Sequence, residues 1–333
     1  ATLPLIDRTS SPAFAAELLR RFLQKGAKSS YIHCLTIVGA LGGPELVSEL
    51  KKILMEWAKG RKSKACEFIL QALLMNRTDA ALRVLEELSR TLRKRRPALA
   101  ELAGMAFATV AEQTRCTPIQ LADRLVPDFG FENLFFEFDV RGERFRAFVD
   151  STFTLVFLDE SNQQHRTMPR RTCSETRAFL KQVAQEIKPL VKLLTVRLEA
   201  DMIVQRVWDG LEWEEFFLRK PVPFAFATTL IWGVLDEDEK DRLSGTFYCQ
   251  EDQTLLDETD QEFTLQPDAR IVLVHPARIS ESLRETWNEK IRETASLQPV
   301  FRQLDRPVVR FANPDRYVLF SEEFSGAEFP SGR

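Results

Sequence analysis

The chain has 333 residues, of which 44% are hydrophobic and 29% are charged, and its formal net charge is −3. This length and composition are typical of a soluble globular protein with two or three domains. The chain contains no apolar run of membrane-spanning length and no signal peptide, which predicts a cytoplasmic location and excludes a membrane partner. Its five cysteines are odd in number and widely spaced, which favours reduced, buried thiols over a disulfide framework.

The charges are divided unevenly along the chain. Residues 1–130 carry 20 Lys+Arg and 13 Asp+Glu, a net charge of +7, whereas the remainder has a net charge of −10. Either the two halves attract each other, or the basic half meets an anionic partner. The acids interspersed among the basic residues favour the first interpretation.

The first part of the chain has apolar residues at helical spacing. Residues 1–10 are expected to form a tail, and from residue 11 to residue 128 every segment is predicted to be helical. Joints such as Gly42-Gly43-Pro44 and Asn76-Arg77-Thr78 recur at intervals of roughly 35 residues, the spacing of helix-pair solenoids. We therefore predict a HEAT-like array of about three helix pairs over residues 1–128, with an irregular helical bundle as the alternative.

Near Pro127 the hydrophobic period changes from 3.6 to 2, which indicates strands. A β-meander is predicted over residues 134–168. A long helix follows over residues 174–208, beginning at Ser174 and kinked or divided by Pro189.

The next segment combines a helix with a small sheet, over residues 224–275. An apolar helix is predicted over 224–235, followed by short strands at 245–249, 263–265 and 271–274. The remaining predicted elements are a helix at 281–294 that begins after Ser280, a strand at 308–311 and a tail at 321–333. The predicted fold class is α+β, an all-α array followed by a mixed domain, residues 129–320, with small antiparallel sheets and helices.

A series of landmarks in the second half resembles a known family. In order, they are Arg206-Val207-Trp208, Pro221, Leu230-Ile231-Trp232-Gly233, Phe247, Val274-His275-Pro276, Trp287 and Gln298-Pro299-Val300-Phe301-Arg302-Gln303-Leu304. Over roughly residues 120–311 this order resembles the bacterial MolR-like family, which is built around a C-terminal domain of unknown function, numbered 4132. The family pattern has a phenylalanine where this chain has Val300. The resemblance implies helical repeats upstream and a link to molybdate-dependent regulation, but it implies no chemistry for any residue.

Polar residues among these landmarks form one candidate site. The candidate ligand-binding residues are Arg206, Trp208, His275, Gln298, Arg302 and Gln303. If they converge, they form a cleft for a carboxylate or phosphate, with arginine as the fork and tryptophan as the platform. The alternative is structural, with Arg206 laid across an aromatic core and His275 bonded to backbone where a strand ends. His33 and His165 do not lie at ligand spacing with Cys, Asp or Glu, so no metal site is predicted.

Basic residues gather at two predicted helix ends. One cluster comprises Lys59, Arg61, Lys62 and Lys64, and the other comprises Arg90, Arg93, Lys94, Arg95 and Arg96. Cations at the carboxyl end of a helix favour its dipole, so solvated helix ends are the simpler interpretation. Nucleic-acid contact is the alternative, although no aromatic residues are interleaved to stack on bases.

The sequence lacks the signatures of common enzymes and cofactor sites. It has no Gly-rich phosphate loop, no G-x-S-x-G, no H-E-x-x-H and no C-x-x-C. The leading hypothesis is an uncharacterised, non-enzymatic regulatory or interaction module with a protein partner and no cofactor. The alternatives are an enzyme or small-anion sensor that uses the Arg206–His275 region, and a nucleic-acid-binding protein that uses the basic helix ends.

Overall fold

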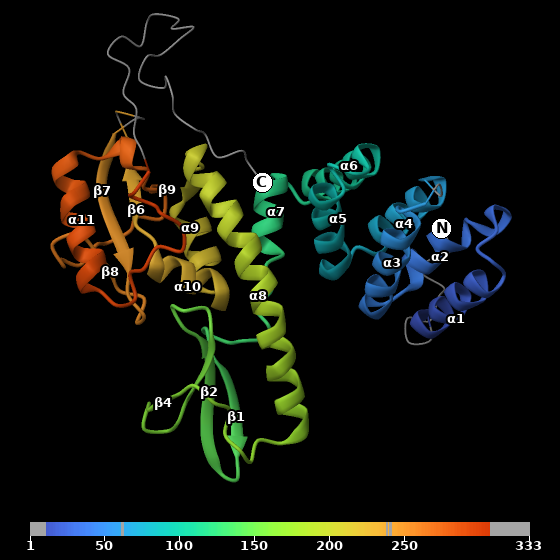
Figure 1. Ribbon diagram of the computed structural model, residues 1–333, viewed down its shortest axis with the longest axis horizontal. Helices are drawn as coiled ribbons and strands as arrows, with labels where there is room; N and C mark the ends of the chain where they lie inside the picture. The colour runs from blue at the N-terminus through green and yellow to red at the C-terminus, as the bar shows by residue number, and fades with distance from the viewer. Residues whose placement is uncertain (1–10, 61–62, 238, 240–241, 307–333) are drawn as a thin grey trace, which may run out of the picture. The chain divides into compact units, whose positions relative to one another are not determined.

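The structure is a computed structural model that describes residues 11–60, 63–237, 239 and 242–306. The chain divides between Pro127 and Asp128 into two compact units, which we call the helical unit and the mixed unit (Figure 1). Helices dominate the first unit and small antiparallel sheets appear only after it, so the predicted α+β fold class is confirmed. The predicted tails and the strand at 308–311 lie outside the described residues.

The helical unit is built from short helices with an apolar core. Their bounds are α1 Ser11–Gln24, α2 Cys34–Leu41, α3 Pro44–Trp57, α4 Ser63–Asn76, α5 Asp79–Thr91, α6 Pro97–Gln113 and α7 Pro118–Arg124. Pro44, Pro97 and Pro118 each occupy a first helical position, where the missing N–H has no cost. The HEAT-like assignment of these helices stays a prediction.

Two of these helices cross at a glycine. A Cβ atom on Gly39 of α2 would lie 2.1 Å from the carbonyl oxygen of Ala72 on α4, so only glycine fits the crossing. Asn76, at the end of α4, donates from Nδ2 to the carbonyl oxygen of Gly42 at 2.7 Å. The end of α2 is therefore tied to the end of α4 by a side chain.

The mixed unit begins with a four-stranded antiparallel sheet in the order β1-β2-β3-β4. Its strands are β1 Phe136–Val140, β2 Glu143–Val149, β3 Leu155–Leu158 and β4 Gln164–His165. Phe136 and Phe138 lie on the inner face of this sheet. Phe136 contacts Phe179 of helix α8 (Ser174–Ile203), with ring centroids 4.8 Å apart. We call the opposite face, which carries Phe148, the outer face, because side chains alternate along a strand.

Helix α8 matches its prediction at its start but not at its end. It begins at Ser174 as predicted, but the residue that caps it is Cys173. The helix continues through Pro189 without division and ends at Ile203, so the predicted extension to residue 208 is wrong. Gln205 has φ of 53°, a left-handed conformation that cannot continue the helix.

The second sheet has the order β5-β9-β6-β7-β8, with antiparallel neighbours throughout. Its strands are β5 Trp208–Asp209, β6 Trp232–Leu235, β7 Leu243–Cys249, β8 Leu255–Leu256 and β9 Arg270–Leu273. The associated helices are α9 Gly210–Trp213, the π-turn Glu214–Leu218, α10 Pro221–Thr229, the 3₁₀ turn Pro276–Arg278 and α11 Glu281–Glu293. Ser280 caps α11 as predicted.

Two predictions for this sheet are wrong. The apolar run 224–235 is not one helix, because α10 ends at Thr229 and the following residues form the central strand β6. A strand buried on both faces is apolar throughout and resembles a buried helix in sequence. Residues 263–265 form no strand, since the chain pairs with β8 only through the bridge between Glu262 and Leu256.

The mixed unit contains the same two-turn meander twice. Phe148 and Val149 pair with Val156 and Leu155, and Tyr248 and Cys249 pair with Leu256 and Leu255 in the same register. Each copy has two five-residue turns. They are 150–154 and 159–163 in the first copy, and 250–254 and 257–261 in the second. In every turn the first residue donates from N–H to the carbonyl oxygen of the fifth, and the fourth residue has positive φ. This is the geometry of a type I turn followed by a left-handed residue.

The described cysteines are all free thiols, but they differ in exposure. Cys66 and Cys249 are buried as expected, whereas Cys173 is exposed, contrary to the expectation of buried thiols. Sγ of Cys173 lies 3.1 Å from Oγ1 of Thr176, and this contact lowers the pKa of the thiol. Burial raises the pKa of Cys249.

We predict that iodoacetamide at neutral pH alkylates Cys173 at least about tenfold faster than Cys249. The thiolate is the nucleophile, and of these two thiols only that of Cys173 is exposed to the reagent. Mass spectrometry of tryptic peptides over a time course measures both rates. Cys249 should react only after unfolding in urea. Equal rates in the native protein would contradict the burial of Cys249.

Candidate binding site

Two of the predicted cleft residues lie together. The guanidinium carbon of Arg206 lies 4.4 Å from the ring centroid of Trp208, and Nη1 of Arg206 forms an ion pair with Oδ2 of Asp201 at 3.3 Å. Trp208 is 1% exposed and makes an edge contact with Trp232. These contacts are those of an arginine laid across an aromatic core. A ligand-binding role for Arg206 and Trp208 stays a prediction.

His275 makes a backbone contact at the end of β9. Its Nδ1 accepts a hydrogen bond from the N–H of Ala277 at 3.2 Å, so the ring caps the following 3₁₀ turn. Burial lowers the pKa of His275, and the positive charges of Arg306 and Arg278 lower it further. The neutral ring is the form that can accept this hydrogen bond.

The remaining cleft candidates serve different parts of the fold. Gln298 donates from Nε2 to the carbonyl oxygen of Ile291 at 2.8 Å and so closes the end of α11. Arg302 is exposed. Gln303 is 1% exposed; its Oε1 accepts from the N–H of Ile231 at 3.0 Å, and its Nε2 donates to the carbonyl oxygens of Ile231 and Val274. The amide of Gln303 thus links the backbones beside β6 and β9.

The basic helix ends are partly engaged. Arg90 forms two hydrogen bonds with the carboxylate of Glu86, and Arg96 donates to the carbonyl oxygens of Ala58 and Gly60. Arg93, Lys94 and Arg95 are exposed, and Arg61 and Lys62 lie outside the described residues. Nucleic-acid contact by this cluster stays a prediction.

A cavity of about 420 Å³ lies elsewhere in the mixed unit, and none of the predicted site residues lines it. Its apolar floor comes from α10, its aromatic wall from the outer face of the first sheet, and its rim from one turn of each meander copy. The lining residues are Leu134, Phe135, Phe148, Val149, Asp150, Ser151, Leu158, Asn162, Gln164, Pro221, Phe224, Ala225, Thr228, Glu251, Asp252 and Gln253. The repeated turns 150–154 and 250–254 therefore border the same cavity.

The aromatic wall is held by neighbouring side chains. The rings of Phe135 and Phe148 have centroids 5.7 Å apart. The guanidinium carbon of Arg146 lies 4.7 Å from the centroid of Phe135, and Nη2 of Arg146 donates to Oδ1 of Asn162 at 2.5 Å. Arg146 and Phe148 are two residues apart on β2, so both project from the same face of the sheet, the outer face.

A second hollow of about 430 Å³ lies on the same outer face and shares Asn162 with the cavity. Its lining is charged and consists of Glu137, Arg144, Arg146, Asp159, Glu160 and Asn162. A hydrogen bond from His165, 2.8 Å from Oδ2 of Asp159, lowers the pKa of this aspartate. The outer face thus runs from a charged hollow into an aromatic cavity.

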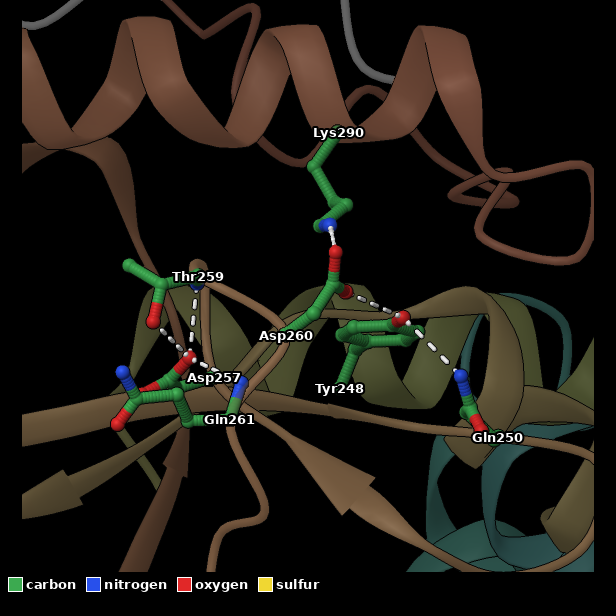
Figure 2. A network of polar contacts seen from close by, with 7 residues as sticks. All are labelled: Tyr248, Gln250, Asp257, Thr259, Asp260, Gln261 and Lys290. Atoms are coloured by element: carbon green, nitrogen blue, oxygen red, sulfur yellow. Dashed lines mark hydrogen bonds and ion pairs between the residues drawn. The ribbon is translucent and has the colours of Figure 1, made fainter.

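A polar network anchors the rim of the cavity to α11 (Figure 2). Lys290 of α11 forms an ion pair with Asp260, and the hydroxyl of Tyr248 donates to Oδ1 of Asp260 at 3.3 Å. Gln250, the first residue of the rim turn, donates from Nε2 to the oxygen of Tyr248 at 3.4 Å. Through Tyr248 the second meander is fastened at both of its turns.

Neither a metal site nor a membrane-spanning helix is found among the described residues. They contain no group of three or more His, Cys, Asp or Glu side chains placed to hold a metal ion. Across the same part of the chain, no helix has the length and apolar character needed to cross a membrane.

The chain was compared with known protein families. A family profile described as "Domain of unknown function (DUF4132)" matches residues 163–333. The chain belongs to the DUF4132 family. The predicted domain of unknown function is thereby confirmed, whereas the comparisons lend no support to the narrower MolR-like assignment.

This DUF4132 chain is also similar to a protein of Escherichia coli. The "Uncharacterized protein YehI" of Escherichia coli (strain K12) is 27% identical over 307 residues, which cover 89% of this chain and 25% of the relative. The chain thus spans about a quarter of the length of this relative. No solved structure matches the chain.

The cavity could not be predicted from the sequence because five separate segments form it, namely residues 134–135, 148–151, 158–164, 221–228 and 251–253. One sequence pattern does point toward the cavity. In each of the four repeated turns, an aspartate or glutamine comes four residues before a threonine or glutamine. Recognising these turns would have paired the two meanders. It would not have placed α10 between them, since that depends on tertiary packing.

We predict that Gln303→Ala lowers the free energy of unfolding by about 3 kcal/mol, because it leaves the buried N–H and carbonyl groups at Ile231 and Val274 without partners. Urea denaturation measures the change. The neighbouring exposed residue supplies the control, and Arg302→Ala should change stability by no more than about 0.5 kcal/mol. Similar losses in both variants would refute the role of the Gln303 amide.

A second prediction concerns His275, whose pKa is lowered on folding. The unfolded chain therefore binds more protons than the folded chain just below the ordinary histidine pKa, so His275 reduces the free energy of unfolding as the pH falls from 7 to 5. Asparagine can cap the turn without titrating. We expect His275→Asn to lose less stability than the wild type over this range, measured by urea denaturation. An unchanged difference between pH 7 and pH 5 would contradict the lowered pKa.

Proposed function

We propose that the mixed unit is a non-enzymatic binding module and that its binding site is the cavity between the repeated turns. The observation that carries this proposal is the composition of the cavity. Phe135 and Phe148 form one wall, Phe224 and Ala225 contribute to the floor, and polar groups lie mainly at the rim. Ligand sites in proteins are typically concave and largely apolar, with a few placed polar groups.

The arrangement of the other candidate residues supports this choice over an anion sensor. Gln298 and Gln303 both use their amides to bond backbone groups, and His275 accepts from backbone with its neutral ring. These three side chains make structural hydrogen bonds and offer little to a carboxylate or phosphate. A regulatory role linked to molybdate rests only on the MolR-like resemblance.

The anchoring of the rim also supports a binding function. The turn with Glu251 and Asp252 is tied through Gln250 and Tyr248 to the ion pair of Asp260 with Lys290. A rim fixed in this way loses little conformational entropy when a ligand binds.

We predict that the neutral dye Nile red binds the chain saturably and that Ser151→Trp weakens this binding about tenfold or more, because the indole fills the mouth of the cavity. A fluorescence titration measures both dissociation constants. Thermal denaturation checks that the variant is folded.

Glu143→Trp is the matched control, since it adds the same side chain at an exposed position on β2 that lines neither hollow. This control should bind the dye as the wild type does. If the wild type shows no saturable binding, or if Ser151→Trp binds equally well, the proposed site is wrong.

A further inference from the structure

Resting on the proposed function, we propose that the occupant of the cavity is a basic peptide segment of a partner protein. Such a segment would lie along the outer face of the first sheet. It would place the stem of a lysine or arginine against Phe135 and Phe148, with the charged head at the acidic rim.

The negative charge of the cavity favours a positively charged occupant. Its lining includes the carboxylates of Asp150, Glu251 and Asp252 and contains no lysine or arginine. Hydrogen bonds from Thr254, mainly from its backbone N–H, lower the pKa of Asp252, so this carboxylate is ionised at neutral pH. A cavity with an anionic rim and an aromatic wall favours a group that is both apolar and positively charged.

The neighbouring charged hollow extends this negative surface along the outer face. It contains the carboxylates of Glu137, Asp159 and Glu160 alongside two arginines. Arg146 is engaged by Asn162 and by the ring of Phe135, and Arg144 lies opposite Asp139 in the strand register. The two hollows together therefore hold six acidic and two basic residues, a net negative surface.

This charge distinguishes a peptide from a nucleic acid. Aromatic rings beside arginines on a sheet face could stack on bases, as in single-strand binding proteins. Such proteins require a positive groove along the phosphates, whereas here the acids outnumber the arginines. The surface would repel a phosphate backbone and attract a cationic chain.

The extent of the surface distinguishes a peptide from a small cation. The cavity and the charged hollow have volumes of about 420 and 430 Å³ and share Asn162. A small amine would occupy the cavity alone and would not extend to the acids of the charged hollow. An extended basic segment, whose successive side chains alternate in direction, can reach carboxylates in both hollows.

The test uses fluorescein-labelled peptides of about ten residues, one with lysine and arginine around a central leucine and one with glutamate in place of every basic residue. Fluorescence polarisation measures binding to the full chain, with single-stranded oligothymidine as a third probe. We expect the basic peptide to bind with a dissociation constant that rises with salt concentration. Free lysine methyl ester, added as a competitor, should displace the peptide only weakly.

Charge-neutralising variants locate the binding. Glu251→Gln with Asp252→Asn removes two charges at the rim, and the asparagine can still accept the hydrogen bond from Thr254. We expect this double variant to bind the basic peptide about tenfold more weakly. Glu262→Gln with Asp268→Asn is the matched control, because it removes the same charge from exposed positions that line neither hollow.

The outcomes separate this inference from the proposed function. Tighter binding of the acidic peptide or of oligothymidine overturns the inference, and so does an equal loss in both double variants, which would indicate non-specific attraction. Displacement by lysine methyl ester at an affinity equal to that of the peptide would replace the peptide with a small amine. If Nile red binding is blocked by Ser151→Trp but no peptide binds, the inference fails while the binding module stands.

Discussion

The mixed unit depends on the burial of Trp232 at the start of the central strand β6. Its ring makes edge contacts with Trp208, Trp213 and Phe217, and its indole N–H donates to the carbonyl oxygen of Ala227 at 3.2 Å. This hydrogen bond ties the sheet to α10, in which every residue is buried. Because its residues are buried and mostly apolar, α10 supplies an apolar floor to the cavity.

The duplicated meander explains how that floor becomes a site. Each copy projects its first turn from the end of a strand, and both turns border the cavity. The family profile begins at residue 163, inside the first copy, so the aromatic wall precedes the matched segment while the floor and the second turn lie within it. The candidate site is therefore assembled from both sides of the boundary that sequence comparison draws.

Much of the fold follows from local sequence patterns. The period of two after Pro127 predicts the first meander, and Ser280 predicts the start of α11. Strand β6 was not predictable in this way, since an apolar run enclosed on both faces shows no period. The end of α8 at Ile203 was equally hidden, because no glycine or proline marks it and Gln205 adopts its positive φ through tertiary contacts. Gln205 donates to the carbonyl oxygen of Met202 at 2.6 Å and reaches that of Leu273 on β9.

The site was harder to predict because the recognisable residues hold the scaffold together. Gln303 completes the backbone bonding beside β6, and Trp287 donates from its indole to Oγ1 of Thr246 at 3.0 Å. Each of these hydrogen bonds requires a particular residue type at a particular position. Residues of this kind are the ones by which the chain resembles a family. The fold can be inferred from them, but the ligand cannot.

The cavity rim obeys a different constraint. In the repeated turns the backbone geometry restricts the first position, which often supplies the side-chain acceptor, and the fourth, which adopts positive φ. The second position is free of both demands, and it is occupied at the cavity by Ser151 and Glu251. The turn can therefore change the charge and size of these side chains without losing its shape. In the proposed binding module, the scaffold would therefore fix the position of the site, and the second turn positions would set the charge and size of its rim.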